Sequence, residues 1–250
     1  MICKIEISNI HPTYKSQGQR HGACCPVPPP SLTKYYFKYE RIVSPYGDNL
    51  GYEILLDFNK ARNEMGDDVV QQYEKAINNG AALEFLIKTL IDNKRWIHAK
   101  RLFINIERVY LCNEQLLQKA VILAKNLHLK GIELVLEITE RNPCGKCAKI
   151  DVGLQYLKSF GIALAADDFD IYSNDFRFGE VLSGVYDYIK IEVPTNESER
   201  KLFNDFILEI SHMSKKVIIE KVEDPTLLNG LFTPFGIQGY AYGTKSPPLP

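Results

Sequence analysis

From Tyr35 onward, the chain alternates between short apolar runs and longer segments whose apolar residues recur at helical spacing. Short apolar runs bounded by polar residues are typical of buried strands, and the longer segments are typical of helices that cover a sheet. The predicted strands are Tyr36–Val43, Gly51–Leu56, Arg101–Ile106, Ile132–Ile138, Ile162–Ala166, Tyr188–Ile191, Val217–Ile219 and a weak one at Gly236–Gln238. The predicted helices are Val69–Ile77, Ala82–Asp92, Glu114–Leu127, Ile150–Ser159 and Glu197–Ser211. This alternation predicts an α/β protein.

The number of predicted strands favours a barrel over an open sheet. Eight strands in a chain of 250 residues fit a (β/α)8, or TIM-type, barrel. An open sheet that binds a dinucleotide is disfavoured, because the chain contains no GxGxxG run. The first two strands are joined only by residues 44–50, which are too few for a crossover helix, so these strands should pair antiparallel. The sequence thus predicts a mostly parallel barrel with its first strand antiparallel.

Residues 1–34 differ from the rest of the chain. They contain prolines at 12, 26, 28, 29 and 30 and lack sustained apolar periodicity. We interpret them as a Pro-rich, flexible leader, with a disordered tail favoured over a docking arm. Residues 35–250 would then form a single barrel domain.

The charges are balanced, with 30 Lys and Arg residues against 31 Asp and Glu residues, so the net charge of −1 identifies no partner. With 45% hydrophobic and 24% charged residues, the composition is that of an ordinary soluble globular protein. No apolar run reaches the roughly 18 residues of a spanning helix, and the N-terminus lacks the apolar centre of a signal peptide. Since no DNA-binding motif is present either, we expect a cytoplasmic protein that binds neither DNA nor a membrane.

The cysteines and histidines do not indicate a zinc site. The six cysteines are expected to be reduced, because a chain of this size needs no disulfides to form a core. Cys144 and Cys147 have the spacing of half a zinc site, but the other close pair is the adjacent Cys24 and Cys25. We interpret Cys144 and Cys147 as two thiols in a loop, and the five histidines show no metal-binding spacing.

Polar residues lie at or just after the ends of the apolar runs in six of the predicted strands. They are Asn105, Glu137, the pair Asp167 and Asp168, Lys190, Glu220 and Gln238. One such residue alone would most simply mark the point where a strand reaches the surface. In a (β/α)8 barrel, however, these positions ring the face that carries the active site, so together they predict one polar site.

The residue types of this site indicate its chemistry. Four carboxylates and an amide oxygen, without histidine or thiol, form a set of hard oxygen ligands that suits Mg²⁺ or Mn²⁺. So many acids without a cation would repel one another, so we expect a divalent-metal centre with two ions. Two such ions favour attack of an activated water on a phosphate ester. Lys190 would hold the water or neutralise phosphoryl oxygens, and the alternative is a structural ion pair with a nearby acid.

Seven segments match the motifs of one family in order. They are Gly51–Leu56 for the EAL motif, Phe103–Ile106 for the asparagine strand, Leu136–Glu140 for ExTE, Asp167–Phe169 for the start of DDFG, Tyr188–Glu192 for YIKID, Ile219–Glu223 for AEGVE and Gln238–Tyr240 for QGY. From about residue 35 to residue 250, the chain therefore resembles EAL-domain proteins, the bacterial phosphodiesterases and receptors of cyclic di-GMP.

The resemblance implies a (β/α)8-like barrel with an antiparallel first strand and a role for each matched residue. The implied metal ligands are Glu53, Asn105, Glu137, Asp167, Asp168 and Glu220. The implied catalytic residues are Glu53, Lys190 and Glu220, and Glu220 acts either at the metal or as a base. Gln238 and Leu55 would support the site or bind substrate, and Glu140 would brace the loop after Asp168. The implied product is linear pGpG, and the implied assembly is a homodimer through the barrel.

Several positions depart from the family pattern. Ile54 replaces the alanine of the EAL triplet, and Asp57 stands where the family often has an arginine that clamps phosphate. The loop Phe169–Asn174 has none of the usual glycines, so it must take another shape. Glu192 replaces the aspartate of YIKID, and Lys221 replaces the glycine of AEGVE.

Two hypotheses of function follow. The first is a cytoplasmic, stand-alone EAL protein that hydrolyses cyclic di-GMP and so regulates motility, fimbriae or biofilm. The second is a weak or inactive EAL domain that acts as a cyclic di-GMP receptor or a protein-binding regulator, which Asp57 and the altered loop would favour. Turnover in Mg²⁺ or Mn²⁺ discriminates between them.

Overall fold

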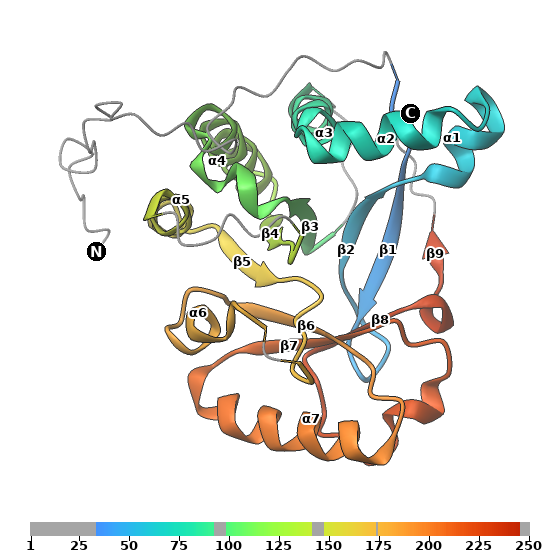
Figure 1. The fold of residues 1–250 in the computed structure, drawn as a ribbon, viewed down its shortest axis with the longest axis vertical. Helices are drawn as coiled ribbons and strands as arrows, with labels where there is room; N and C mark the ends of the chain where they lie inside the picture. The colour runs from blue at the N-terminus through green and yellow to red at the C-terminus, as the bar shows by residue number, and fades with distance from the viewer. Residues whose placement is uncertain (1–33, 93–98, 142–147, 174, 246–250) are drawn as a thin grey trace.

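The computed structural model describes residues 34–92, 99–141, 148–173 and 175–245. In this part of the chain, nine strands form one sheet in the order β2-β3-β4-β5-β6-β7-β8-β1-β9, and β1 also pairs with β2. The sheet therefore closes into a barrel of eight strands, with β9 added beside β1 (Figure 1). The strands are β1 Phe37–Val43, β2 Asn49–Leu56, β3 Arg101–Ile106, β4 Glu133–Ile138, β5 Ala163–Ala166, β6 Tyr188–Glu192, β7 Lys216–Glu220, β8 Gly236–Gln238 and β9 Thr244–Lys245.

The direction of the strands confirms the predicted reversal. Strand β1 is antiparallel to both β2 and β8, whereas β2 to β8 are parallel to one another. The turn between β1 and β2 is tight, because the Ser44 hydroxyl accepts hydrogen bonds from the backbone N–H groups of Tyr46 and Asp48. Gly47 lies in that turn at a φ of 86°, where a side chain would be strained. The fold class predicted from the sequence is thus confirmed.

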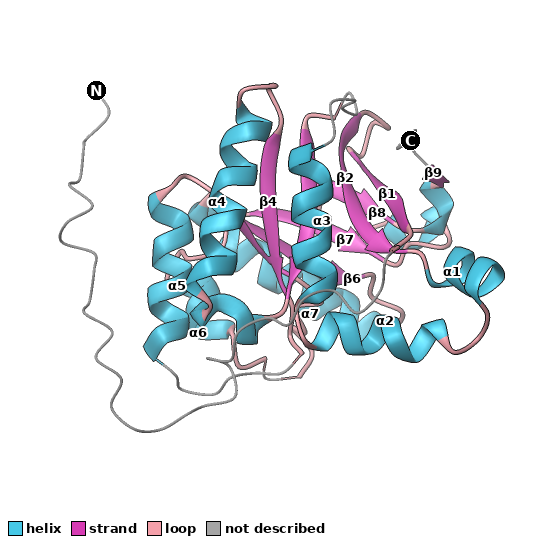
Figure 2. Cartoon of the chain, turned by 90° about the horizontal axis from the view of Figure 1, so that it is seen from above, coloured by secondary structure: helices cyan, strands magenta, loops and turns pink. Residues whose placement is uncertain are grey.

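Helices lie on the outside of the strands (Figure 2). The α-helices are α1 Phe58–Met65, α2 Val69–Asn78, α3 Ala81–Asp92, α4 Glu114–His128, α5 Ala148–Ser159, α6 Phe178–Leu182 and α7 Glu197–Ile210. Short 3₁₀ helices are η3 Arg108–Cys112, η4 Ser211–Met213, η5 Pro225–Leu228 and η6 Tyr240–Tyr242. The sequence analysis predicted α2, α3, α4, α5 and α7 and missed α1 and α6, which are too short to show a clear helical period. None of the described helices is long and apolar enough to cross a membrane.

The described residues form three hydrophobic clusters. The largest fills the space between the sheet and the helices and includes Leu102, Ile104, Leu136 and Ile189. A second packs Tyr35 and Tyr36 against residues of α1, α2 and α3. The smallest fills the barrel itself and consists of Ile42, Phe103, Val135, Ala163, Ala165, Tyr188 and Ile218. We call this smallest cluster the barrel floor. The rings of Phe103 and Tyr188 meet edge to face there, with their centroids 5.4 Å apart.

The remaining expectations about the ends and loops of the chain lie outside the described residues. These are the leader 1–34, of which the structure describes only Lys34, and the thiols Cys144 and Cys147. The division of the chain into a leader and a barrel domain therefore stays a prediction.

Candidate metal centre

The polar site lies directly above the barrel floor, on the same strands. Side chains alternate along a strand, so residues two positions apart point to the same side of the sheet. The floor residues Phe103, Val135, Ala165, Tyr188 and Ile218 are each followed two positions later by Asn105, Glu137, Asp167, Lys190 and Glu220. Because parallel strands end at the same side of the barrel, these polar groups converge in its mouth. The convergence expected from the sequence is therefore present.

Lys190 lies at the centre of this site and is fully buried. Its Nζ is 2.6 Å from Oε1 of Glu137, 2.8 Å from Oε1 of Glu220, 2.9 Å from Oδ1 of Asp167 and 3.1 Å from Oε2 of Glu53. One ammonium thus pairs with four carboxylates from β2, β4, β7 and the end of β5. A single positive charge cannot balance four negative ones, so the site retains an excess of acid.

Amide groups orient Glu53 within the site. Nδ2 of Asn105 donates to Oε1 of Glu53 at 2.8 Å, and Nε2 of Gln238 donates to its Oε2. Gln238 precedes Gly239, whose φ of 148° and close approach to the backbone of Val222 leave no room for a side chain. The strand end of β8 is therefore held against the segment after β7, which places Gln238 beside Glu53.

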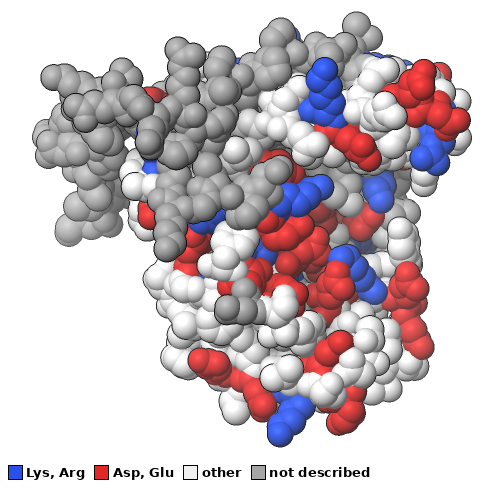
Figure 3. Space-filling model, viewed as in Figure 1, with Lys and Arg blue, Asp and Glu red and all other residues white. Residues whose placement is uncertain are grey.

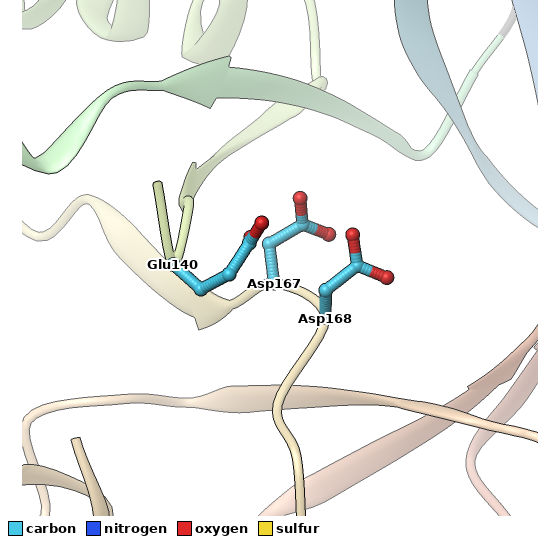
Figure 4. A group of neighbouring side chains, drawn as sticks. All are labelled: Glu140, Asp167 and Asp168. Carbon is cyan, nitrogen blue, oxygen red and sulfur yellow. The ribbon is translucent and has the colours of Figure 1, made fainter. Parts of the chain in front are cut away.

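A second group of acids lies at the outer side of the mouth. One carboxylate oxygen each from Glu140, Asp167 and Asp168 lies within 4.8 Å of the others. Figure 4 shows these three side chains next to one another. Asp167 belongs to both groups, since it also pairs with Lys190. The two groups together contain every carboxylate for which metal ligation was predicted, and the remaining predicted ligand, Asn105, donates a hydrogen bond to Glu53. On the face shown in Figure 3, acidic side chains gather near the middle with basic ones among them.

The electrostatics of the mouth differ from one acid to the next. Burial alone would raise the pKa of Glu53, but Lys190 and the hydrogen bonds from Gln238 and Asn105 lower it. Burial and the neighbouring carboxylate of Glu53 raise the pKa of Glu137 well above its ordinary value, against the effect of Lys190. Burial also raises the pKa of Glu220, to about 8. Desolvation would lower the pKa of Lys190, yet the carboxylates, Asp167 foremost, raise it.

The unsatisfied oxygens of the mouth fit a divalent cation. Within the described part of the chain, Oδ1 of Asn105, Oε2 of Glu137, Oε2 of Glu220 and Oε1 of Gln238 are buried and accept no hydrogen bond. A buried acceptor without a partner is costly, and a cation removes that cost. Carboxylate and amide oxygens are the ligands that Mg²⁺ and Mn²⁺ prefer. The residues present therefore fit a divalent-metal centre.

Arg177 is a site residue that the sequence analysis missed. Its fully buried guanidinium donates to the backbone carbonyls of Ile138 and Asp167, each at 2.8 Å, and to that of Asp168 at 3.2 Å. It also forms an ion pair of 2.7 Å with Asp175. Arg177 thus holds the end of β5 against the end of β4. No motif marks Arg177 in the sequence. The one local signal is Asp175, two residues earlier, with which it forms the ion pair.

The loop after Asp168 takes its shape without glycine. Asp168 itself adopts a φ of 43°, and no residue from 169 to 173 has a positive φ. The carboxylate of Asp170 accepts the backbone N–H groups of Tyr172 at 2.8 Å and Ser173 at 2.9 Å. The hydrogen bonds to Asp170 and those of Arg177 hold the loop in a conformation that needs no glycine. Asn174, the last residue of the loop, lies outside the described residues.

A cavity of about 350 Å³ opens beside the site. Asn105 lines this cavity and is also part of the polar site. Apolar residues that include Leu55, Phe37 and Phe58 line the rest of the cavity wall. Asp57 also lies on this wall, and its carboxylate accepts the backbone N–H of Lys60 at 2.9 Å, which caps the first turn of α1. The residue that departs from the family pattern therefore has a local structural role, which its sequence position did not reveal.

Comparison with known proteins agrees with this geometry. Residues 32–243 match the EAL domain family. This chain belongs to the EAL domain family. The structure brings seven residues of the matched motifs together in one barrel mouth: Glu53, Asn105, Glu137, Asp167, Asp168, Lys190 and Glu220.

One curated relative of this EAL domain is the cyclic di-GMP phosphodiesterase PdeF of Escherichia coli. The two are 24% identical over 175 residues, which make up 66% of this chain and 23% of PdeF. The match therefore spans less than a quarter of the relative's length.

Solved EAL structures share the fold. The EAL enzyme Bd1971, in a form bound to cAMP and cyclic di-GMP, aligns with a TM-score of 0.64 and 18% identity, over 83% of this chain and 61% of that chain. The YkuI protein of Bacillus subtilis, with an EAL domain and in complex with cyclic di-GMP and calcium, aligns with a TM-score of 0.58 and 22% identity, over 86% of this chain and 55% of that chain. At such identities the likeness establishes the barrel fold.

Proposed function

We propose that this EAL domain hydrolyses one phosphodiester bond of cyclic di-GMP and releases linear pGpG. The observation that carries the proposal is the set of buried, unsatisfied oxygens around Lys190 in the barrel mouth. Membership of the EAL family and the similarity to PdeF support the choice of substrate. The reaction would lower the concentration of a second messenger and so regulate motility, fimbriae or biofilm.

The proposed cofactors are two ions of Mg²⁺ or Mn²⁺. Their proposed ligands are Glu53, Asn105, Glu137, Asp167, Asp168 and Glu220. When bound, the ions would activate a water for in-line attack on the phosphate. The calcium in the YkuI complex supports a divalent cation at a site of this family.

The chain's own groups would position the reactants. Lys190 holds four carboxylates around itself and would also contact the attacking water or a phosphoryl oxygen. Asn105 and Gln238 fix the orientation of Glu53. Glu220 would act either as a metal ligand or as the base, and in the metal-free site burial raises its pKa to about 8. The apolar cavity beside Asn105 has the size and lining to receive a nucleobase.

Hydrolysis of cyclic di-GMP by the purified full chain, in Mg²⁺ and in Mn²⁺, tests this proposal. Two variants on the same strand form a matched pair: Glu137→Gln at the mouth end of β4 and Glu133→Gln at its other end, where Glu133 pairs with Arg101. We expect turnover to fall at least 100-fold in Glu137→Gln and to stay near the wild-type rate in Glu133→Gln. Equal rates in both variants would contradict the proposed site.

A second candidate function is that of a catalytically weak receptor for cyclic di-GMP or a protein-binding regulator. The observation in its favour is Asp57, which puts a carboxylate on the cavity wall where the family often has an arginine. Binding of cyclic di-GMP in Ca²⁺ with no turnover in Mg²⁺ or Mn²⁺ would support this candidate. The proposed assembly in either case is a homodimer through the barrel, which sedimentation velocity tests.

A further inference from the structure

Lys221 holds a second ammonium at the outer side of the mouth. It follows β7 directly and has a φ of 57°, a left-handed conformation that is unfavourable for any residue except glycine. The family motif that this segment resembles has glycine at this position. The backbone conformation of Lys221 is therefore unfavourable. The position of its side chain shows what the lysine contacts in exchange.

The ammonium of Lys221 joins two acids. Its Nζ is 3.1 Å from Oδ1 of Asp168, and it also forms an ion pair with Glu192. Desolvation would lower the pKa of Lys221, but hydrogen bonds to Glu192 and Asp168 raise it, so the positive charge is retained throughout the neutral range. Glu192 ends β6, which pairs with β7, and Asp168 follows β5, which pairs with the other edge of β6.

Two departures from the family pattern thus meet in space. Glu192 replaces the aspartate of the YIKID motif, and Lys221 replaces a glycine that lies 29 residues further along the chain. Strands β6 and β7 are in register with Glu192 opposite Glu220, so residue 221 emerges next to Glu192. The ion pair between Glu192 and Lys221 helps to hold the Lys221 ammonium beside Asp168.

Asp168 is one of the three acids that form the outer group of possible ligands. The inner group has its own cation in Lys190, which is fully buried and cannot leave without unpairing four carboxylates. Lys221, by contrast, has 57% of its side chain exposed, so it can move away when a stronger cation arrives. A divalent ion at Asp168 must displace this ammonium or bind within a few ångströms of its charge.

We infer that Lys221 is a built-in cation that competes with the second divalent ion at Asp168, so that this chain binds one ion tightly and the second one weakly. The inference rests on the proposed function, because it takes Asp168 as a metal ligand. Occupancy of the outer position would then require a higher concentration of free metal than occupancy of the inner one. The chain would reach full activity only when divalent metal is abundant.

Titration of the metal-free full chain with Mn²⁺, with free Mn²⁺ followed by electron paramagnetic resonance, measures both affinities without nucleotide. Lys221→Gly removes the charge and the backbone strain, and Lys221→Gln removes only the charge. The matched control is Lys216→Gln, at the opposite end of the same strand, where the ammonium contacts Tyr188. We expect both variants at residue 221 to bind the second ion about tenfold more tightly than the wild type and the control, with the first ion unchanged.

Each other outcome counts against the inference. Two equally tight ions in the wild type, or a gain in Lys221→Gly that Lys221→Gln does not share, would overturn it and leave the proposed function intact. Absence of Mn²⁺ binding in all four proteins would instead overturn the metal centre on which the proposed function rests, and the inference with it.

Discussion

The floor and the mouth of the barrel lie on the same strands, but the floor is filled by apolar side chains and the mouth by charged ones. The floor residues are apolar, and rings such as those of Phe103 and Tyr188 fill the space at van der Waals distance. Two positions further along, the mouth holds a buried ammonium and carboxylates whose pKa values diverge. The floor gains stability from packing alone, whereas the mouth depends on charge balance. The comparison shows that burial is matched by packing in the floor, whereas in the metal-free mouth it leaves acids with raised pKa values and, among the described residues, acceptors without partners.

The largest expected effect comes from removing the central charge of the mouth. Lys190→Met leaves four buried carboxylates without their common cation, so in EDTA it should destabilise the chain by about 3–5 kcal/mol and lower Tm by about 10 °C. Thermal unfolding by circular dichroism measures the change. Because the repulsion is between acids, Mn²⁺ should recover part of the loss. An unchanged Tm in EDTA would show that Lys190 does not balance the mouth.

Substitutions in the barrel floor should change stability through packing, and by the same amount with and without metal. Phe103→Leu leaves a small cavity beneath the site, and we expect a loss of about 2 kcal/mol in the free energy of unfolding. The same loss should appear in EDTA and in Mn²⁺, because no ligand atom is changed. Denaturant unfolding under both conditions provides the measurement. A loss that Mn²⁺ reverses would mean that floor and mouth are not independent.

An effect of opposite sign is expected for Glu220 in the metal-free chain. Its folded-state pKa of about 8 exceeds the ordinary value of 4.5, so the folded chain keeps a proton that the unfolded chain loses. Stability due to this group is therefore full below about pH 4.5 and is lost as the pH rises towards 8. Glu220→Gln should remove this loss and be more stable than the wild type by as much as about 4 kcal/mol at pH 8 in EDTA.

Unfolding curves at pH 5 and pH 8 measure this difference. The two proteins should nearly coincide at pH 5, and in Mn²⁺ the order at pH 8 should reverse because the variant lacks a ligand oxygen. A wild type whose stability in EDTA does not fall relative to Glu220→Gln between these pH values would contradict the raised pKa.

The smallest expected change in stability is at the rim of the mouth. Asp57→Asn keeps the helix cap on Lys60 but removes the negative charge from the cavity wall. The free energy of unfolding should change by less than about 0.5 kcal/mol, because Asn caps helices as well as Asp does. Affinity for cyclic di-GMP in Ca²⁺ should rise by about threefold to tenfold, since a repelling anion is gone. Calorimetric titration measures it, and Asp48→Asn in the β1–β2 turn serves as a control for net charge.

Much of the fold could be predicted because strands and helices carry their own periodicity. All eight barrel strands and five helices were found in this way, including the three-residue strand Gly236–Gln238. The missed elements are α1, α6, β9 and the 3₁₀ helices η3 to η6, which have between two and eight residues. Elements this short contain too few turns or alternations to stand out from a loop.

The candidate site divides in the same way between what was predictable and what was not. Polar residues at strand ends and the family motifs predict the residues of the mouth, which are Glu53, Asn105, Glu137, Asp167, Asp168, Lys190 and Glu220. Arg177 was not predicted, because its carbonyl partners at Ile138 and Asp167 belong to other segments of the chain. The role of Asp57 as a helix cap was also missed, since α1 itself was not recognised.

The sequence by itself determined the barrel, the direction of its first strand and the residue types that gather in its mouth, because these follow from periodicity along the chain and the length of one turn. Only the tertiary structure decided which charges meet. Lys190 pairs with a carboxylate 137 residues away, and Lys221 meets Glu192 across two strand ends. Such contacts depend on sheet closure and register, which bring distant residues within a few ångströms of each other, and no local pattern in the sequence encodes that distance.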